Sequence, residues 1–127
     1  MNWPNLSNSA KDTASESSHM AHNVFAHTVF FTLNTPTEES RQRLIDSCHH
    51  HLSDHPGTLF FGAGTRATSY TRPVNDARFD VVLHLIFATQ ADHDVYQQAP
   101  RHQQFIEENQ ETWAEVRVFD SHLVGGG

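Results

Sequence analysis

Runs of β-branched and aromatic residues recur along the chain and predict four strands. They lie at residues 27–33, 58–67, 79–87 and 116–123, and each mixes apolar positions with polar ones as strands do. The run at 79–87 is the clearest of the four. In the second run, Gly62 and Gly64 predict a bulge or a close approach of another group to the backbone.

The first helix is expected at residues 36–53. Thr35 fits an N-cap, with Pro36 at the first helical position and Glu38 three residues after the cap, which is the pattern of a capping box. Pro56 and the glycine after it end the segment. Its apolar positions recur at helical spacing: Leu44, Ile45, Cys48 and Leu52.

Two shorter helices are expected between the third and fourth strands. Thr89 and Asp92 can cap the first of them, which carries Val95 and Tyr96 and is interrupted at Pro100. The second begins near residue 101. Its residues on one stripe are His102, Phe105, Ile106, Asn109 and Trp113.

The resulting order is β-α-β-β-α-β, which predicts an α+β chain with a ferredoxin-like fold. Helices cover only one face of such a sheet, yet the strands carry apolar residues on both faces. Val82 and Ile86 alternate with Val81, Leu83 and Leu85. A second apolar face left in water would be an association site. Two sheets packed face to face would bury it and enclose a barrel-like cavity, so we expect a homodimer.

Length and charge narrow the class of protein. The chain has 127 residues and a formal net charge of −7, from eight Lys plus Arg against fifteen Asp plus Glu. One domain is expected at 23–123, between a disordered N-terminal tail at 1–22 and a flexible C-terminal tail at 124–127. The acidic balance makes nucleic acid and membrane surfaces poor partners. A single cysteine and no membrane span or signal peptide favour the cytoplasm.

The segment from residue 26 to residue 122 resembles the stress-responsive A/B barrel (Dabb) family of small dimeric α/β barrels. The resemblance covers about three quarters of the chain. It rests on His-Thr-Val-Phe-Phe at 27–31, on the strand at 79–87, on Tyr96 followed by Ala-Pro-Arg-His at 99–102 with Phe105, and on Val-Arg-Val-Phe-Asp at 116–120. One departure is Ala99, where the family usually has the first histidine of His-Pro-x-His.

Some relatives in this family are polyketide cyclases or lyases that use a first-strand histidine and a helix histidine in a pocket without a cofactor. The resemblance therefore implies His27 and His102 as candidate catalytic residues, with Tyr96 nearby. A histidine that titrates near neutral pH suits general acid and base work on an enolisable ketone. The alternative is structural: each histidine hydrogen-bonds the backbone, and Tyr96 belongs to the core with its hydroxyl satisfied.

Other residues are candidates for lining a ligand cavity. Asp80 and His84 share one face of a strand and could form a polar spot in the barrel interior; alternatively, Asp80 pairs with Arg78 or Arg66 near a strand end. Asp120 on the last strand is interpreted as structural. Aromatic side chains favour a flat apolar ligand. The candidate apolar lining comprises Phe31, Phe87 and Phe105.

We predict no metal site and no cofactor. Consecutive histidines on a helix point about 100° apart, so His49, His50 and His51 cannot converge on one ion, whereas His51 and His55 at i, i+4 could. No carboxylate or cysteine completes that pair, and a solvated helix face is the preferred interpretation. Cys48 is expected to be a core thiol. The glycines at 62 and 64 lack the third glycine and the lysine of a phosphate loop.

Three hypotheses for function follow. The leading one is a homodimer that binds a small hydrophobic or aromatic molecule in the dimer cavity. The alternative is a cofactor-free lyase, cyclase or monooxygenase-like enzyme in which His27 and His102 move protons and Tyr96 orients the substrate. A third is that dimerisation is itself the purpose of the domain.

Overall fold

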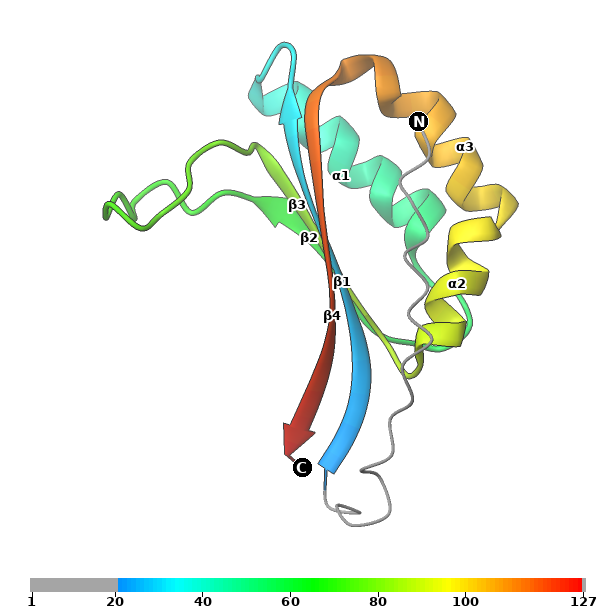
Figure 1. Ribbon diagram of the computed structural model, residues 1–127. Coiled ribbons are helices and arrows are strands. Elements are labelled where there is room, and N and C mark those ends of the chain that lie inside the picture. Colours follow the sequence, from blue (N-terminus) through cyan, green and yellow to red (C-terminus); the bar gives the residue numbers. More distant parts are fainter. Residues whose placement is uncertain (1–20, 127) are drawn as a thin grey trace.

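The computed structural model describes residues 21–126, which form a four-stranded sheet with all of its helices on one face (Figure 1). The elements in chain order are β1 (Ala21–Leu33), α1 (Glu38–Leu52), β2 (Thr58–Thr65), β3 (Val81–Phe87), α2 (Gln90–Gln98), α3 (Pro100–Asn109), the 3-10 helix η2 (Gln110–Thr112) and β4 (Trp113–Gly126). The strand order is β2-β3-β1-β4 and all pairs are antiparallel. The predicted ferredoxin-like α+β fold is confirmed.

The hydrophobic core lies between the helices and the two central strands, β1 and β3. In β1 and β3 alternate side chains face the helices and are buried, and the burial of β3 alternates strictly along its length. The helices contribute one apolar stripe each to the same layer. The buried residues of this core include Phe31, Leu83, Leu85 and Phe87 from the sheet, Leu44 and Leu52 from α1, Tyr96 from α2, and Phe105 and Ile106 from α3.

The start of α1 differs from the prediction. The N-cap is Thr37 rather than Thr35, and the reciprocal bonds of the capping box join Thr37 and Ser40 at 3.0 Å and 2.9 Å. Thr-Pro-Thr offers two candidate caps, and the one chosen also lets the Ser40 hydroxyl donate to the carbonyl of Thr35 at 2.8 Å. The predicted cap of α2 is confirmed, because the backbone N–H of Asp92 donates to the Thr89 hydroxyl at 3.0 Å.

Strands β1 and β4 run further than the sequence pattern indicated. β1 and β4 pair from Ala21 opposite Gly126 to Leu33 opposite Trp113, so a strand continues into the segment that was expected to be a flexible C-terminal tail. Small and polar residues weaken the strand signal there, but backbone pairing does not depend on them. Of the predicted N-terminal tail at residues 1–22, residues 1–20 lie outside the described residues, and Ala21 and His22 belong to β1.

The bulge in β2 is not at its glycines. The register of β2 against β3 shifts between Thr58 and Phe60. At Gly62 the alternative prediction holds, namely that another group comes close to the backbone. A Cβ there would lie 3.0 Å from the ring of Phe60, which is on the same face of the strand.

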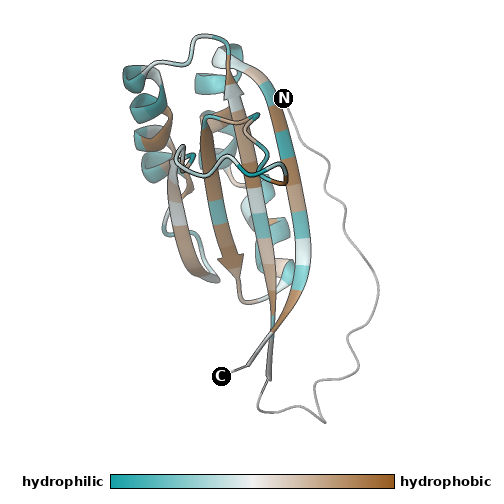
Figure 2. Cartoon of the chain, turned by 90° about the vertical axis from the view of Figure 1, so that its left-hand side faces the viewer, coloured by the Kyte–Doolittle hydropathy of each residue, from teal (hydrophilic) through white to brown (hydrophobic). Residues whose placement is uncertain are grey.

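The sheet face opposite the helices stays open in the subunit. Figure 2 looks onto this face and shows the strands in front of the helices, with apolar stretches on the strands. The segment between β2 and β3 projects away from the body on the side opposite the helices (Figure 1). Within residues 21–126, no helix combines the length and apolar character needed to cross a membrane.

Candidate functional site

A cluster of buried aromatic and titratable side chains lies between the sheet and helices α2 and α3. His27 comes from the middle of β1, Tyr96 and His93 from one face of α2, where they are three residues apart, and His102 from the first turn of α3. Their exposed fractions are 0% for His27, 1% for Tyr96 and 2% for His93 and His102. The three residues predicted from the sequence as catalytic candidates therefore do meet, and they meet inside one subunit. The cavity expected between two sheets lies on the other face.

The shortest polar contact in this cluster joins His27 to Asp120. The two residues are cross-strand partners of β1 and β4, and Nδ1 of His27 lies 2.6 Å from Oδ1 of Asp120. An ionised carboxylate only accepts hydrogen bonds, so Nδ1 of His27 donates. The Asp120 side chain is 14% exposed, which places it at the solvent edge of the cluster while the imidazole lies inside.

His93 extends the cluster toward α2. Its Nδ1 lies 3.2 Å from Oδ1 of Asp94 and its Nε2 lies 3.9 Å from Oδ1 of Asp120. The rings of His93 and His27 are 4.9 Å apart between centroids. Burial lowers the pKa of His93, and His27 lowers it further, while Asp120 and Asp94 act in the opposite direction. The neutral imidazole is therefore favoured.

Tyr96 lies at the centre of the ring contacts. Its centroid is 4.9 Å from that of His102, 5.0 Å from that of His55 and 5.8 Å from that of His27. Its hydroxyl is buried without a hydrogen-bond partner among the described residues, and burial raises the pKa of Tyr96 well above its usual value. The phenol therefore keeps its proton and is a donor for any polar group that reaches it.

His102 is held neutral. Burial, the largest cause, together with charge repulsion from His27, His55 and His93 lowers the pKa of His102 to about 3. At neutral pH this side chain is not an imidazolium acid. His27, by contrast, has the carboxylate of Asp120 as a hydrogen-bond partner.

The predicted ligand-lining residues divide between the two faces of the sheet. Phe31, Phe87 and Phe105 belong to the core on the helix side, and the ring of Phe87 is 5.1 Å from that of Tyr96. His84 lies on the open face, where Nδ1 is 3.4 Å from the hydroxyl of Thr28. The sheet thus separates His84 from the cluster.

Asp80 lies at a strand end, away from both sets. Its Oδ2 accepts a hydrogen bond of 2.8 Å from the backbone N–H of Leu33. Neither Arg78 nor Arg66, the expected partners, contacts this carboxylate. Arg78 binds Asp76 at 2.7 Å, and Nε of Arg66 donates to the carbonyl of Phe79 at 3.2 Å. Asp80 therefore joins the start of β3 to the end of β1.

The histidines at 49–51 and 55 do not form one solvated face, and that interpretation is wrong for two of them. His51 and His55 are buried. Nε2 of His51 lies 2.9 Å from Oε2 of Glu108 on α3, and Nε2 of His55 donates to the carbonyl of His51 at 2.8 Å. The spacing from Leu44 through Cys48 to His51 places that histidine on the apolar stripe, which is the sequence signal for its burial.

His93 and Asp120 were missed as members of the site. His93 was not singled out, although it precedes Tyr96 by three residues and so shares its helix face. Asp120 was interpreted as structural, although the inward alternation of β4 through Val116 and Val118 continues to it. Both signals become informative only when β1, β4 and α2 are known to pack together.

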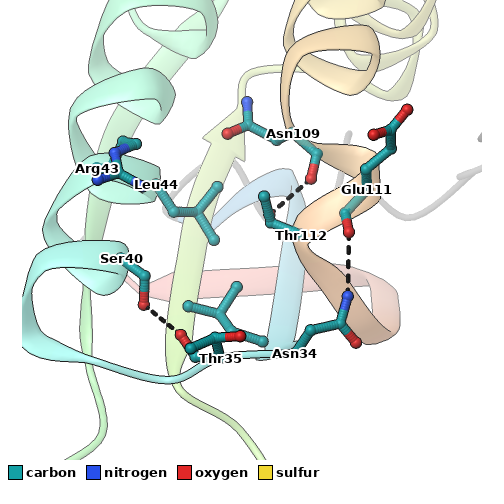
Figure 3. A pocket seen from close by; sticks show the side chains of 9 residues that line it. Asn34, Thr35, Ser40, Arg43, Leu44, Asn109, Glu111 and Thr112 are labelled. Atoms are coloured by element: carbon teal, nitrogen blue, oxygen red, sulfur yellow. Dashed lines mark hydrogen bonds between the residues drawn. The ribbon is translucent and has the colours of Figure 1, made fainter.

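The surface pockets lie elsewhere on the described part of the chain. None of four pockets lined by described residues includes His27, Tyr96 or His102. One of about 250 Å³ lies where β1 passes into α1 (Figure 3). Its polar groups bind one another: Asn34 donates to the carbonyl of Glu111 at 3.0 Å, and Thr112 donates to that of Asn109 at 2.7 Å. The polar groups of this pocket therefore hold neighbouring segments of the chain together.

Fold and site together define a ferredoxin-like α+β domain with a buried histidine cluster under its second helix. The chain belongs to the family described as the stress responsive A/B barrel domain (Dabb), whose model matches residues 25–123. No curated protein sequence matches the chain significantly.

Several solved structures share this fold. A dimeric ferredoxin-like protein of unknown function from Thermobifida fusca is similar with a TM-score of 0.66 and 14% identity, covering 80% of this chain and 92% of its own. A Dabb family protein with a ferredoxin-like fold from Mesorhizobium loti has a TM-score of 0.65 and 22% identity, covering 79% and 96%. A hydroxynitrile lyase from Passiflora edulis has a TM-score of 0.63 and 16% identity, covering 79% and 93%.

Proposed function

We propose that this protein is a homodimer that forms through the open face of its sheet and binds a small hydrophobic or aromatic molecule between the two sheets. The observation that carries the proposal is the exposure of large aromatic side chains on that face: Phe60 is 55% exposed and Phe119 is 51% exposed. Both occupy positions that point away from the helices, opposite Ile86 and Thr28. Burying such rings is worth roughly 1.5–3 kcal/mol each.

The aromatic residues of this face form a continuous group. The ring of Phe30 is 4.8 Å from that of Phe79 and 5.7 Å from that of Phe119, and Arg117 lies over Phe30 at 5.7 Å. Exposed apolar patches of this kind mark association sites. A second copy of the same chain presents the same face, so a two-fold arrangement would bury both at once.

Space for a ligand is expected on the open face beside the edge strand β2. Gly62 and Gly64 of β2 lie opposite His84 and Val82 of β3, and a Cβ at Gly64 would contact nothing within 4 Å. The missing side chain at Gly64 would leave a hollow between two packed sheets. His84 and Thr28 beside it would supply polar contacts, and the phenylalanines would supply flat apolar walls.

The described relatives support the dimer. The Thermobifida fusca protein is itself described as dimeric, and it shares the sheet and helix arrangement of this chain. The family name also describes a barrel, which a single sheet of four strands with one open face does not complete.

The dimer is tested by sedimentation or light scattering at micromolar concentration. The wild type is expected to be a dimer, and Phe119→Arg is expected to weaken association at least about tenfold by placing a charge in the interface. The matched control is Val95→Arg, because Val95 is an exposed apolar residue on α2, away from the open face. A monomeric wild type, or equal effects of the two substitutions, would contradict the proposal.

The ligand is tested separately with an apolar fluorescent probe such as anilinonaphthalene sulfonate. The dimer is expected to bind the probe, and Gly64→Leu is expected to abolish binding by filling the hollow while the dimer persists. Unchanged probe binding in Gly64→Leu would remove the hollow as the binding place.

A second candidate function, a cofactor-free enzyme, is favoured by the pair His27 and Asp120. A carboxylate that holds a buried imidazole at 2.6 Å fixes its orientation and stabilises the imidazolium that forms when it accepts a proton. His27 would take a proton from a carbon acid such as an enolisable ketone, while Tyr96 and neutral His102 would orient the substrate. The hydroxynitrile lyase from Passiflora edulis is an enzyme with a similar fold.

This enzyme reading requires the substrate to enter a fully buried cluster, so α2 must move away from the sheet. A screen of small ketones and cyanohydrins tests it with His27→Asn and His102→Ala. Lost turnover in both variants with retained binding supports the enzyme. Turnover that is absent from the wild type, or unaffected by His27→Asn, rejects it.

A further inference from the structure

We propose that His27, His93 and Asp120 bind a divalent transition-metal ion between β1, α2 and β4. The ligand atoms would be Nδ1 of His27, Nε2 of His93 and Oδ1 of Asp120. This site departs from the sequence prediction of no metal, which considered only the histidines of α1. It does not rest on the proposed dimer, because the three residues lie on the helix side of the sheet within one subunit.

The three ligand atoms are already gathered to nearly the spacing that a metal requires. They all lie within 4.8 Å of one another, with 2.6 Å from His27 to Asp120 and 3.9 Å from His93 to Asp120. Metal bonds to imidazole nitrogen and carboxylate oxygen are about 2.0–2.2 Å, which separates tetrahedral ligands by roughly 3.4 Å. The His27–Asp120 distance must open and the His93–Asp120 distance must close, each by less than about 1 Å. The distance between the two histidine nitrogens, at most 4.8 Å, must close by up to about 1.4 Å. Side-chain rotations supply shifts of this size.

Asp94 orients His93 as a supporting residue of a metal site does. Its Oδ1 lies 3.2 Å from Nδ1 of His93, so Nδ1 carries the proton and the lone pair of Nε2 points toward Asp120. Nε2 is buried and makes no hydrogen bond among the described residues. Metal-binding histidines commonly donate their second nitrogen to a carboxylate in this way, and that partner fixes both the tautomer and the ring.

The proton balance of binding is simple. Without metal, Nδ1 of His27 donates to Asp120. To bind the ion, His27 moves this proton to Nε2 and offers the Nδ1 lone pair, which is a change of tautomer with no net loss of a proton. Two neutral imidazoles and one carboxylate carry a charge of about −1, and Asp94 adds a second negative charge beside the site, so a divalent cation would be balanced.

The ligand set indicates the class of metal. Two imidazoles and one carboxylate suit Zn²⁺, Co²⁺ or Fe²⁺ better than Mg²⁺ or Ca²⁺, which prefer oxygen ligands. Three protein ligands leave a coordination position for water or an exogenous ligand. Asp120 and Asp94 have side chains 14% and 29% exposed, whereas the imidazoles are buried, so the carboxylate side is the route by which the ion would enter.

The probe for this site is Co²⁺ added to the full, untagged chain, followed by its visible absorption and by calorimetry. We expect one tightly bound ion per subunit with the intense absorption of a four-coordinate or five-coordinate site. His93→Gln and Asp120→Asn should each weaken binding at least about tenfold, and Asp94→Asn should weaken it about tenfold while leaving the ligands in place.

The matched control is the double variant His49→Gln and His50→Gln, which removes two exposed histidines from α1. It should bind Co²⁺ as the wild type does. A wild type that binds no Co²⁺, binding that persists in both ligand variants, or binding that disappears in the control would overturn the proposal.

A measurement on the unaltered protein covers the case in which a ligand variant does not fold. In the wild type labelled with ¹⁵N-histidine, Zn²⁺ should shift Nδ1 of His27 and Nε2 of His93 and should leave the ring nitrogens of His84 unchanged. Shifts confined to other histidines would equally overturn the site.

Discussion

His27 on β1 and Asp120 on β4 are cross-strand neighbours on the helix side of the sheet, with Nδ1 of the histidine 2.6 Å from Oδ1 of the aspartate. The imidazole is fully buried, and the carboxylate lies between it and solvent. A buried donor that has lost its charged acceptor pays its full desolvation cost. This pair is therefore a stability element whatever else the cluster does.

We expect Asp120→Ala to lower the free energy of unfolding by about 1–3 kcal/mol near neutral pH. Urea denaturation measures the loss. Glu115→Ala is the matched control, because Glu115 is an exposed acid on the same strand, and it should change stability little. Equal losses in the two variants would show that the contact contributes nothing.

The neutral state of His102 should make the fold sensitive to acid. Its pKa is lowered to about 3 in the folded chain, so between that value and the ordinary value near 6.5 the unfolded chain binds a proton that the folded chain does not. Stability therefore rises with pH across this window and falls as the pH drops, by up to about 1.4 kcal/mol per pH unit from this group.

Replacing His102 with Leu should make the pH dependence of stability shallower between about pH 6 and pH 4, measured as the urea midpoint at several pH values. His84→Leu is the control, because His84 is exposed on the open face. Identical slopes for the wild type and His102→Leu would mean that His102 titrates normally in the folded chain.

Gly57 should be intolerant of a side chain. Its φ is +84°, and a Cβ there would overlap the side chain of Asp92 in the first turn of α2. Gly57→Ala should therefore lower stability by at least about 1 kcal/mol. Gly64→Ala is the matched control, because a Cβ at Gly64 meets nothing within 4 Å. Thermal denaturation compares the two, and a stable Gly57→Ala would show that the turn adjusts freely.

Cys48 should be unreactive in the folded chain. It is completely buried, and burial raises the pKa of its thiol to about 12, so the thiolate that reacts is scarce. A thiol reagent such as dithiobisnitrobenzoate should label it only in denaturant. A cysteine introduced by Val95→Cys, at an exposed position, should react at once in the folded protein. Rapid labelling of Cys48 without denaturant would indicate frequent opening of α1.

Local sequence signals predicted the elements well where one face of an element is apolar. The alternation of β3 and the caps of α2 are determined by neighbours a few residues apart, and both are present as expected. Local sequence signals failed where two neighbouring residues suit the same role. Thr35 and Thr37 both suit an N-cap, and the choice depends on how Ser40 folds back onto the preceding turn.

The sequence by itself determined the order of elements, the one-sided placement of the helices and the apolar character of both sheet faces, because these follow from periodicity and from the short connections of the chain. It also indicated His27, Tyr96 and His102 through a resemblance. Only the tertiary structure decided which face of the sheet each of them occupies.

In the folded chain, Asp120 and His93 lie beside His27, and His84 lies on the opposite face of the sheet. Residues 93 positions apart become hydrogen-bond partners only when β1 and β4 take one particular register. A shift of one residue would turn each side chain to the other face. Strand register depends on packing over the whole core, and no local stretch of sequence contains that information.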